Sequence, residues 1–165
     1  MLQTTRNIIL LNSQTLSVSG TTGAIGIPDG YDTCILYFNV GSPTGTTETL
    51  DMYIQQGFKA APAATDVIGT DQTATTYTIW DDYAHFAQVT TSAGTQVLRI
   101  MQGTGNATTA TGTSSFTAGQ DAALAVSTVK AGPLGSTWRL KWVITGTLPV
   151  YPTTWMIGQF LPMGS

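Results

Sequence analysis

The chain has 165 residues, a length that fits one domain, and only 9% of them are charged, against about 25% in an average soluble protein. The formal net charge is −3, and the six basic residues are scattered along the sequence, which argues against a face that neutralises nucleic-acid phosphates. The single cysteine, Cys34, excludes an internal disulfide, and no stretch approaches the roughly 18 apolar residues of a membrane span.

Threonine dominates the composition. Roughly one residue in five is threonine, whose β-branched side chain suits an exposed strand better than a helix. Glu48 is the only glutamate and there are three lysines, so the usual surface residues of helices are almost missing. We therefore predict an all-β chain with few or no helices, a single jelly-roll-like or related β-sandwich over residues 1–165. So few surface charges also favour association with other subunits.

The N-terminal segment, residues 1–16, contains the short apolar run Ile8–Leu11 after Arg6. This run is shorter than the roughly 7–15 apolar residues of a signal peptide, and no Ala-x-Ala site follows it. We expect a chain that is made and used without export, and an extended segment that contacts other subunits.

Two alternating runs come next. From Cys34 to Val40 apolar residues occupy every second position, and from Thr49 to Gln56 the same pattern returns after a turn rich in Gly, Ser and Pro. Alternation with a period of two is typical of a strand with one buried face. We predict that the two runs form a hairpin with one face in the core.

The middle of the chain alternates between strands and long connections. Residues 59–78 are weakly patterned and longer than most loops, so we expect a functional or interface loop there. An aromatic run follows at 80–89, then a strand at 95–102 and a surface loop of Gly, Thr, Ala and Ser at 103–115. Residues 122–130 fit either a short helix or a strand, and the turn that follows them favours the strand.

The strongest strand pattern is Trp138 to Thr145, where both tryptophans fall on the apolar face that we assign to the core. Pro149, Pro152 and Pro162 interrupt the remainder, which contains a last apolar strand from 154 to 161. Because proline cannot donate a ladder hydrogen bond, we expect residues 150–165 at a sheet edge or in an extended arm.

No catalytic, metal or cofactor site is predicted. His85, the only histidine, has Asp81 and Asp82 nearby, but the sequence offers no Gly-x-Ser-x-Gly turn to place a nucleophile. Cys34 fits a small buried hydrophobe. Adjacent aspartates on a strand point to opposite faces, and no zinc or calcium ligand spacing is present. The glycine-rich segment Gly20–Gly26 contains no lysine, which a phosphate-binding loop needs. We interpret its glycines as turn residues.

Exposed aromatic side chains on a β-sandwich can stack on sugar rings, which makes glycan binding an alternative function. Trp80 and Tyr83 are the main candidates, together with Tyr37 and Tyr53, and aspartates lie near enough in sequence to bind sugar hydroxyls.

Two stretches carry a resemblance to a known group of proteins. Gly30–Gly41 followed by Gly45–Gln55 resembles the opening hairpin of small β-sandwich structural proteins of tailed bacteriophages, and the runs 86–90, 94–100 and 139–147 are similar to the rest of that pattern. These pieces span most of residues 30–147. Residues 59–78, the loop 103–115 and the proline-rich tail depart from the pattern. The resemblance supplies no catalytic residues.

The resemblance implies a capsid decoration or cement protein that is assembled in the host cytoplasm and lies on the virion surface. Its partners would be the major capsid protein and copies of itself, in a homotrimer. Placement at the neck or tail is an alternative, as is a carbohydrate-binding module, whereas nucleic acid, membrane, metal and cofactor are not expected. The residues that we expect to contact partners or ligands lie in the aromatic run and in the two terminal segments: Trp80, Tyr83, His85, Arg6, Ile8, Leu10, Tyr151 and Trp155.

Overall fold

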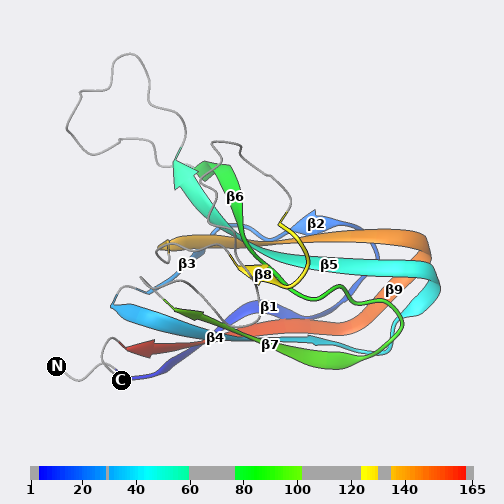
Figure 1. The fold of residues 1–165 in the computed structure, drawn as a ribbon, viewed down its shortest axis with the longest axis horizontal. Helices are drawn as coiled ribbons and strands as arrows, with labels where there is room; N and C mark the ends of the chain where they lie inside the picture. Colours follow the sequence, from blue (N-terminus) through cyan, green and yellow to red (C-terminus); the bar gives the residue numbers. More distant parts are fainter. Residues whose placement is uncertain (1–3, 29, 60–76, 102–123, 130–134, 163–165) are drawn as a thin grey trace, which may run out of the picture.

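The computed structural model of the chain describes residues 4–28, 30–59, 77–101, 124–129 and 135–162 (Figure 1). Within these residues every regular element is a strand, so the expected all-β class is confirmed. The strands are β1 (Arg6–Leu16), β2 (Gly20–Thr21), β3 (Ile25–Gly26), β4 (Tyr31–Val40), β5 (Thr44–Lys59), β6 (Tyr77–His85), β7 (Gly94–Met101), β8 (Thr128–Val129) and β9 (Thr137–Pro162).

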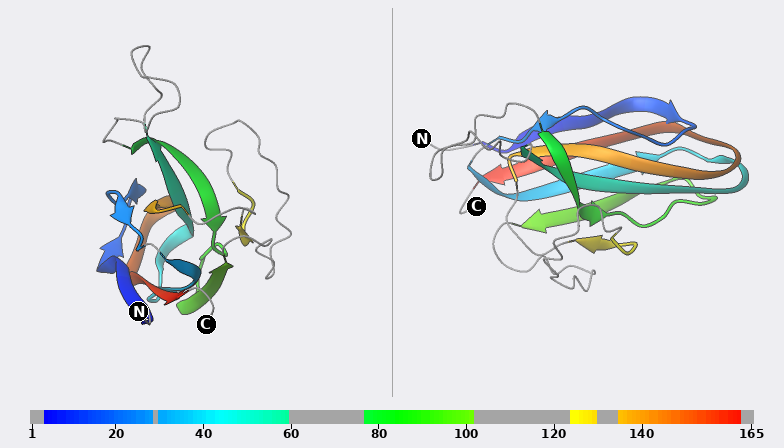
Figure 2. Two further views of the ribbon diagram at one scale, coloured as in Figure 1. Left: turned by 90° about the vertical axis from the view of Figure 1, so that its left-hand side faces the viewer. Right: turned by 90° about the horizontal axis from the view of Figure 1, so that it is seen from above.

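The strands form one connected antiparallel sheet that curls back on itself, so that two halves face each other across the core (Figures 1 and 2). The lower half in Figure 1 has the order β7-β4-β9-β1. The upper half has β6 beside β5, β5 beside β9, and β2 with β3 on the other side of β9. Short strand β8 pairs with β6.

Strand β9 belongs to both halves. Its first part, through Val150, pairs with β5, and its second part, from Tyr151, pairs with β1 and β4. Before the bend, Gly146 has a φ of 112° and a Cβ there would lie 2.7 Å from the Cα of Glu48 on β5, so this position in the ladder needs glycine. The chain thus passes from one half of the sheet to the other without leaving the strand.

The core lies between the two halves. Strand β4 contributes Leu36 and Phe38 from below, and β5 contributes Leu50 and Met52 from above, all four fully buried. The two parts of β9 also meet there, since the ring of Trp138 lies 5.9 Å from that of Phe160. On β4 the buried face is the one that the alternation predicts, whereas on β5 the second face is buried as well, since Tyr53 is 7% and Gln55 0% exposed. Of the two tryptophans assigned to the core, Trp138 is fully buried and Trp142 is partly exposed.

The predicted hairpin is wrong. β4 and β5 are consecutive in sequence, yet β4 pairs with β7 and β9 while β5 pairs with β6 and β9. The apolar faces of both runs are buried, but in opposite halves of the curled sheet. The turn at Gly41 to Pro43 therefore joins the two halves instead of two neighbouring strands.

The terminal segments are not free arms where the structure describes them. β1 pairs with the second part of β9 from Arg6 to Leu16, and that part of β9 lies between β1 and β4. Leu10, Leu11 and Leu16 are buried. Burial of these leucines is the physical reason why the expected interface arm becomes a strand of the sheet.

Other expectations fall partly or wholly outside the described residues. The connection predicted at 59–78 lies mostly there, as does the whole loop 103–115. Of residues 122–130 the structure describes 124–129, where the strand is Thr128–Val129 and follows a turn in which Ser127 has a φ of 59°. No helix among the described residues is long and apolar enough to cross a membrane.

Candidate functional site

An apolar row crosses the outer face of the lower half. In the register of the sheet, Val97 lies opposite Tyr37, Tyr37 opposite Ile157, and Ile157 opposite Ile9. Their strand neighbours Leu36, Met156 and Leu10 are buried, so these four side chains point outward. The ends of the row are open, because Val97 is 61% and Ile9 63% exposed, whereas the two central residues are partly exposed.

The residues that flank this row are almost uncharged. The neighbouring outward positions hold Thr95, Asn39 and Trp155 on one side and Arg99, Ile35, Gln159 and Asn7 on the other. Thr95 donates a hydrogen bond to Asn39 Oδ1 at 3.0 Å, so two of the polar groups satisfy each other. Arg99 is the one charged side chain among these outward positions. The face can therefore be covered by another protein with little desolvation of charge.

The two edges of the lower half differ. β7 pairs with β4 over eight consecutive positions without a register shift, from Gly94 to Met101. β1 pairs with β9 with three register shifts, between Ile9 and Leu16. Bulges protect an edge against pairing with another strand, whereas a regular edge is open to it. β7 is the edge without this protection.

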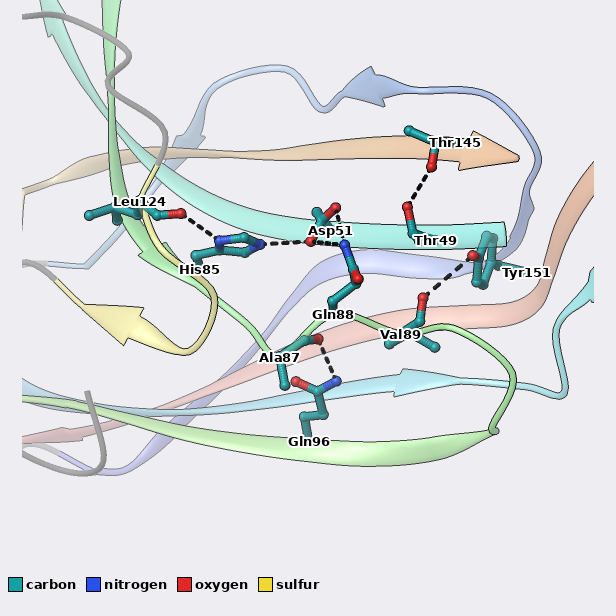
Figure 3. Close-up of polar contacts among 10 residues, drawn as sticks. All are labelled: Thr49, Asp51, His85, Ala87, Gln88, Val89, Gln96, Leu124, Thr145 and Tyr151. Atoms are coloured by element: carbon teal, nitrogen blue, oxygen red, sulfur yellow. Dashed lines mark hydrogen bonds and ion pairs between the residues drawn. The ribbon is translucent and has the colours of Figure 1, made fainter. Parts of the chain in front are cut away.

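A polar cluster lies on the outer side of the upper half. His85 Nδ1 lies 2.7 Å from the carbonyl oxygen of Leu124, and Nε2 lies 3.1 Å from Asp51 Oδ1 (Figure 3). Gln88 donates to the same carboxylate at 2.9 and 3.1 Å. Tyr53 stacks on the imidazole with 4.0 Å between ring centroids. Both nitrogens of this 3% exposed histidine are therefore occupied within the chain.

The cluster continues along the same face through Asp82, which is fully buried. Gln55 donates to Asp82 Oδ1 at 2.6 Å and accepts from Arg139 Nε at 2.6 Å. Lys141 Nζ lies 3.5 Å from the same Asp82 oxygen, and 5.0 Å from the centroid of the Tyr53 ring. Asp82 Oδ2 has no hydrogen-bond partner in the part of the chain that the structure describes. The contacts of this buried carboxylate connect β6 with β5 through Gln55 and with β9 through Lys141.

Burial also sets the titration of two groups. It raises the pKa of Tyr53, with the charges of Asp51 and Asp82 as smaller contributions in the same direction. Desolvation raises the pKa of the Cys34 thiol as well, so the reactive thiolate is disfavoured at this buried position. Within the described ranges, no group of three or more His, Cys, Asp or Glu side chains is arranged to hold a metal ion.

No family model, curated protein or solved structure matches this chain. The geometry of its own residues has to carry the functional argument.

The structure separates the residues predicted to contact partners. Four of them are each at most 4% exposed: Tyr83, His85, Leu10 and Tyr151. The expectation that these side chains contact partners at the surface is therefore corrected, because they are buried. Both Tyr83 and His85 belong to β6, where Tyr83 packs in the hydrophobic core and His85 is held in the polar cluster. Leu10 packs into the core from β1, and Tyr151 lies at the bend of β9.

The other four predicted residues remain accessible but lie in two places. Arg6 is exposed on β1, and Ile8 and Trp155 are partly exposed in the lower half. Trp80 is partly exposed in the upper half, where the guanidinium carbon of Arg139 lies 4.4 Å from the ring centroid. Only Trp155 borders the apolar row.

Sequence reasoning missed the row itself. A signal was present, because Ile35 and Tyr37 place apolar side chains on the second face of a strand whose first face is already apolar. Ile9 stands in the apolar run before Leu10. What the sequence could not supply was the register that aligns these residues with Val97 and Ile157.

Proposed function

We propose that this protein is a non-catalytic structural subunit that works by binding copies of itself and another protein, as a decoration or cement protein of a tailed-bacteriophage capsid does. The observation that carries the proposal is the apolar row Val97, Tyr37, Ile157 and Ile9 on a nearly uncharged sheet face. A contiguous exposed apolar patch with a polar rim is typical of a protein-binding surface.

Weak contacts are sufficient for such a role. Subunits that repeat on a shell bind through many identical contacts at once, so the total affinity exceeds that of one contact. A neutral face loses little on desolvation when it is covered. The low charge of the chain, 9% of residues, favours the same kind of association.

The environment of the two most reactive side chains supports a non-catalytic role. A general base needs a free lone pair within reach of a substrate proton, but the two nitrogens of His85 already face Leu124 and Asp51. Cys34 is fully buried among core residues, and a nucleophilic cysteine needs partial exposure and a thiolate.

The alternative of a carbohydrate-binding module has less support. A sugar-stacking platform needs open aromatic faces, yet Tyr83 is 4% exposed and Tyr53 is 7% exposed. Trp80 keeps partial exposure, but Arg139 occupies one face of its ring. A tryptophan fluorescence titration with a panel of soluble glycans should give no saturable change, and a saturable change would favour the carbohydrate alternative.

The direct test is to look for the chain on particles. Virus particles produced from the genome that encodes the chain are purified and analysed by mass spectrometry, and labelled with an antibody against the chain for electron microscopy. We expect the chain in stoichiometric amounts with label over the shell. Label confined to the neck or tail would favour the alternative of a neck or tail protein. Particles that lack the chain would overturn the proposal.

A further inference from the structure

We propose that β7 pairs edge to edge, antiparallel, with β7 of a second copy, so that the lower halves of two chains form one continuous sheet around a two-fold axis. This inference depends on the self-association part of the proposed function and identifies its contact. The expected assembly is a dimer, where the family resemblance implies a trimer.

The first argument is the contrast between the edges. An unpaired strand edge presents a row of backbone N–H and C=O groups that another strand can pair with. β1 interrupts its edge with three register shifts, but β7 is regular along Gly94–Met101 and contains no proline and no lysine. Within the described residues β4 is the only strand that pairs with β7.

The second argument is self-complementarity. Residues directly opposite one another in an antiparallel pair share a face, so a two-fold axis at Val97 places Val97 opposite its own copy and Thr95 opposite Arg99. An axis at Leu98 would place Val97 opposite Arg99, and an axis at Arg99 would oppose two like charges, which is unfavourable. Of these three registers, β7 favours the one centred on Val97, whose side chain is 61% exposed.

The third argument is continuity of the surface. In that register the row Val97, Tyr37, Ile157 and Ile9 of one copy runs directly into the same row of the second copy. The exposed end of each row, where Val97 is 61% exposed, becomes the centre of the joined sheet. Eight strands would then present one apolar row to a third protein such as a shell subunit.

The test introduces charged side chains at Val97, on the proposed two-fold axis. Full-length protein is measured by light scattering over a concentration series, and we expect twice the chain mass of 17.4 kDa at high concentration. Val97→Lys and Val97→Glu each place like charges opposite each other and should raise the dimer dissociation constant about tenfold or more. An equimolar mixture of the two variants should recover the dimer, because opposite charges then face each other.

Val18→Lys is the matched control, since Val18 is 73% exposed but lies outside every strand. It should dimerise like the wild type, and circular dichroism should show the same strand content in all variants. Dimers that persist in both Val97 variants, or a mixture that stays monomeric, would overturn the β7 contact while leaving self-association intact. A wild-type chain that is monomeric at all concentrations would overturn this inference and the self-association on which it depends, whereas the particle analysis tests binding to the shell separately.

Discussion

The imidazole of His85 has an oxygen at each ring nitrogen, and Asp51 provides the charged one at 3.1 Å. Asp51→Asn keeps the shape of the side chain but removes the charge that strengthens this contact and the contact from Gln88. Because His85 is buried, the weakened hydrogen bond is not replaced by water. We expect a loss of about 1–3 kcal/mol in the free energy of unfolding, measured by urea denaturation.

Gln88→Ala is the control for this prediction. Gln88 is exposed, so its removal leaves the His85–Asp51 contact intact and exchanges two hydrogen bonds for water. It should cost less than about 1 kcal/mol. Equal losses in the two variants would mean that the contact with His85 contributes nothing to stability.

The titration of Tyr151 should make the stability of the protein decrease at alkaline pH. Burial, with the charges of Glu48 and Asp51 as smaller causes, raises its pKa from 10.0 to about 12. Between these values the folded chain keeps a proton that the unfolded chain has lost, so stability is full below pH 10 and decreases as the pH rises towards 12. Tyr151→Phe should show a smaller decrease over this interval in urea denaturation at fixed pH values.

Tyr37→Phe serves as the comparison, because Tyr37 lies on the outer face and its replacement leaves Tyr151 in place. It should keep the wild-type decrease between pH 10 and 12. If the stability of Tyr151→Phe decreases with pH as steeply as that of Tyr37→Phe, the titration of Tyr151 does not contribute to the alkaline loss of stability.

At the scale of elements, β1 is a strand of the sheet and its two faces have different roles. Leu10 is 4% exposed and points into the core, whereas its neighbour Ile9 is 63% exposed. Leu10→Ala should lower the free energy of unfolding by about 2–5 kcal/mol, because it leaves a cavity. Ile9→Ala should change it by less than about 1 kcal/mol in the same urea denaturation. If β1 were a free arm, the two variants would have equal and small effects.

Alternation predicts faces but not partners. The sequence places Leu36, Leu50 and Leu140 in the core, and all three are fully buried, because a period of two determines which face is apolar. The pairing of β4 and β5 was predicted wrongly because β9, some hundred residues later in the chain, lies between them. A non-local strand of this kind leaves no mark in the local pattern.

The candidate site was predictable to a smaller extent. Tyr83 was expected at the surface because exposed aromatic side chains on a β-sandwich can stack on sugars, but it packs in the hydrophobic core. The apolar row exists only once four strands that are distant in sequence are in register. Its members could be found singly from apolar residues on the outer face, as with Tyr37, but their alignment required the topology.

At the scale of the whole molecule, the described charges are unevenly distributed. Asp51 and Asp82, together with Arg139 and Lys141, are engaged in the cluster on the upper half. The outer face of the lower half has Arg99 as its charged outward side chain. Two faces of one curled sheet thus have different chemistry: one is fixed internally by hydrogen bonds, and the other presents an apolar row with exposed ends.

This division predicts how salt affects self-association. Exposed ion pairs weaken when salt screens them, but apolar contact and backbone hydrogen bonds do not. The dimer dissociation constant should therefore change by less than about threefold between 0.1 and 1 M sodium chloride in sedimentation experiments. Arg99→Gln should behave like the wild type, because Arg99 faces Thr95 in the proposed register. A dimer that weakens tenfold in high salt would instead be held by charged groups and not by the apolar and backbone contacts of the proposed β7 pair.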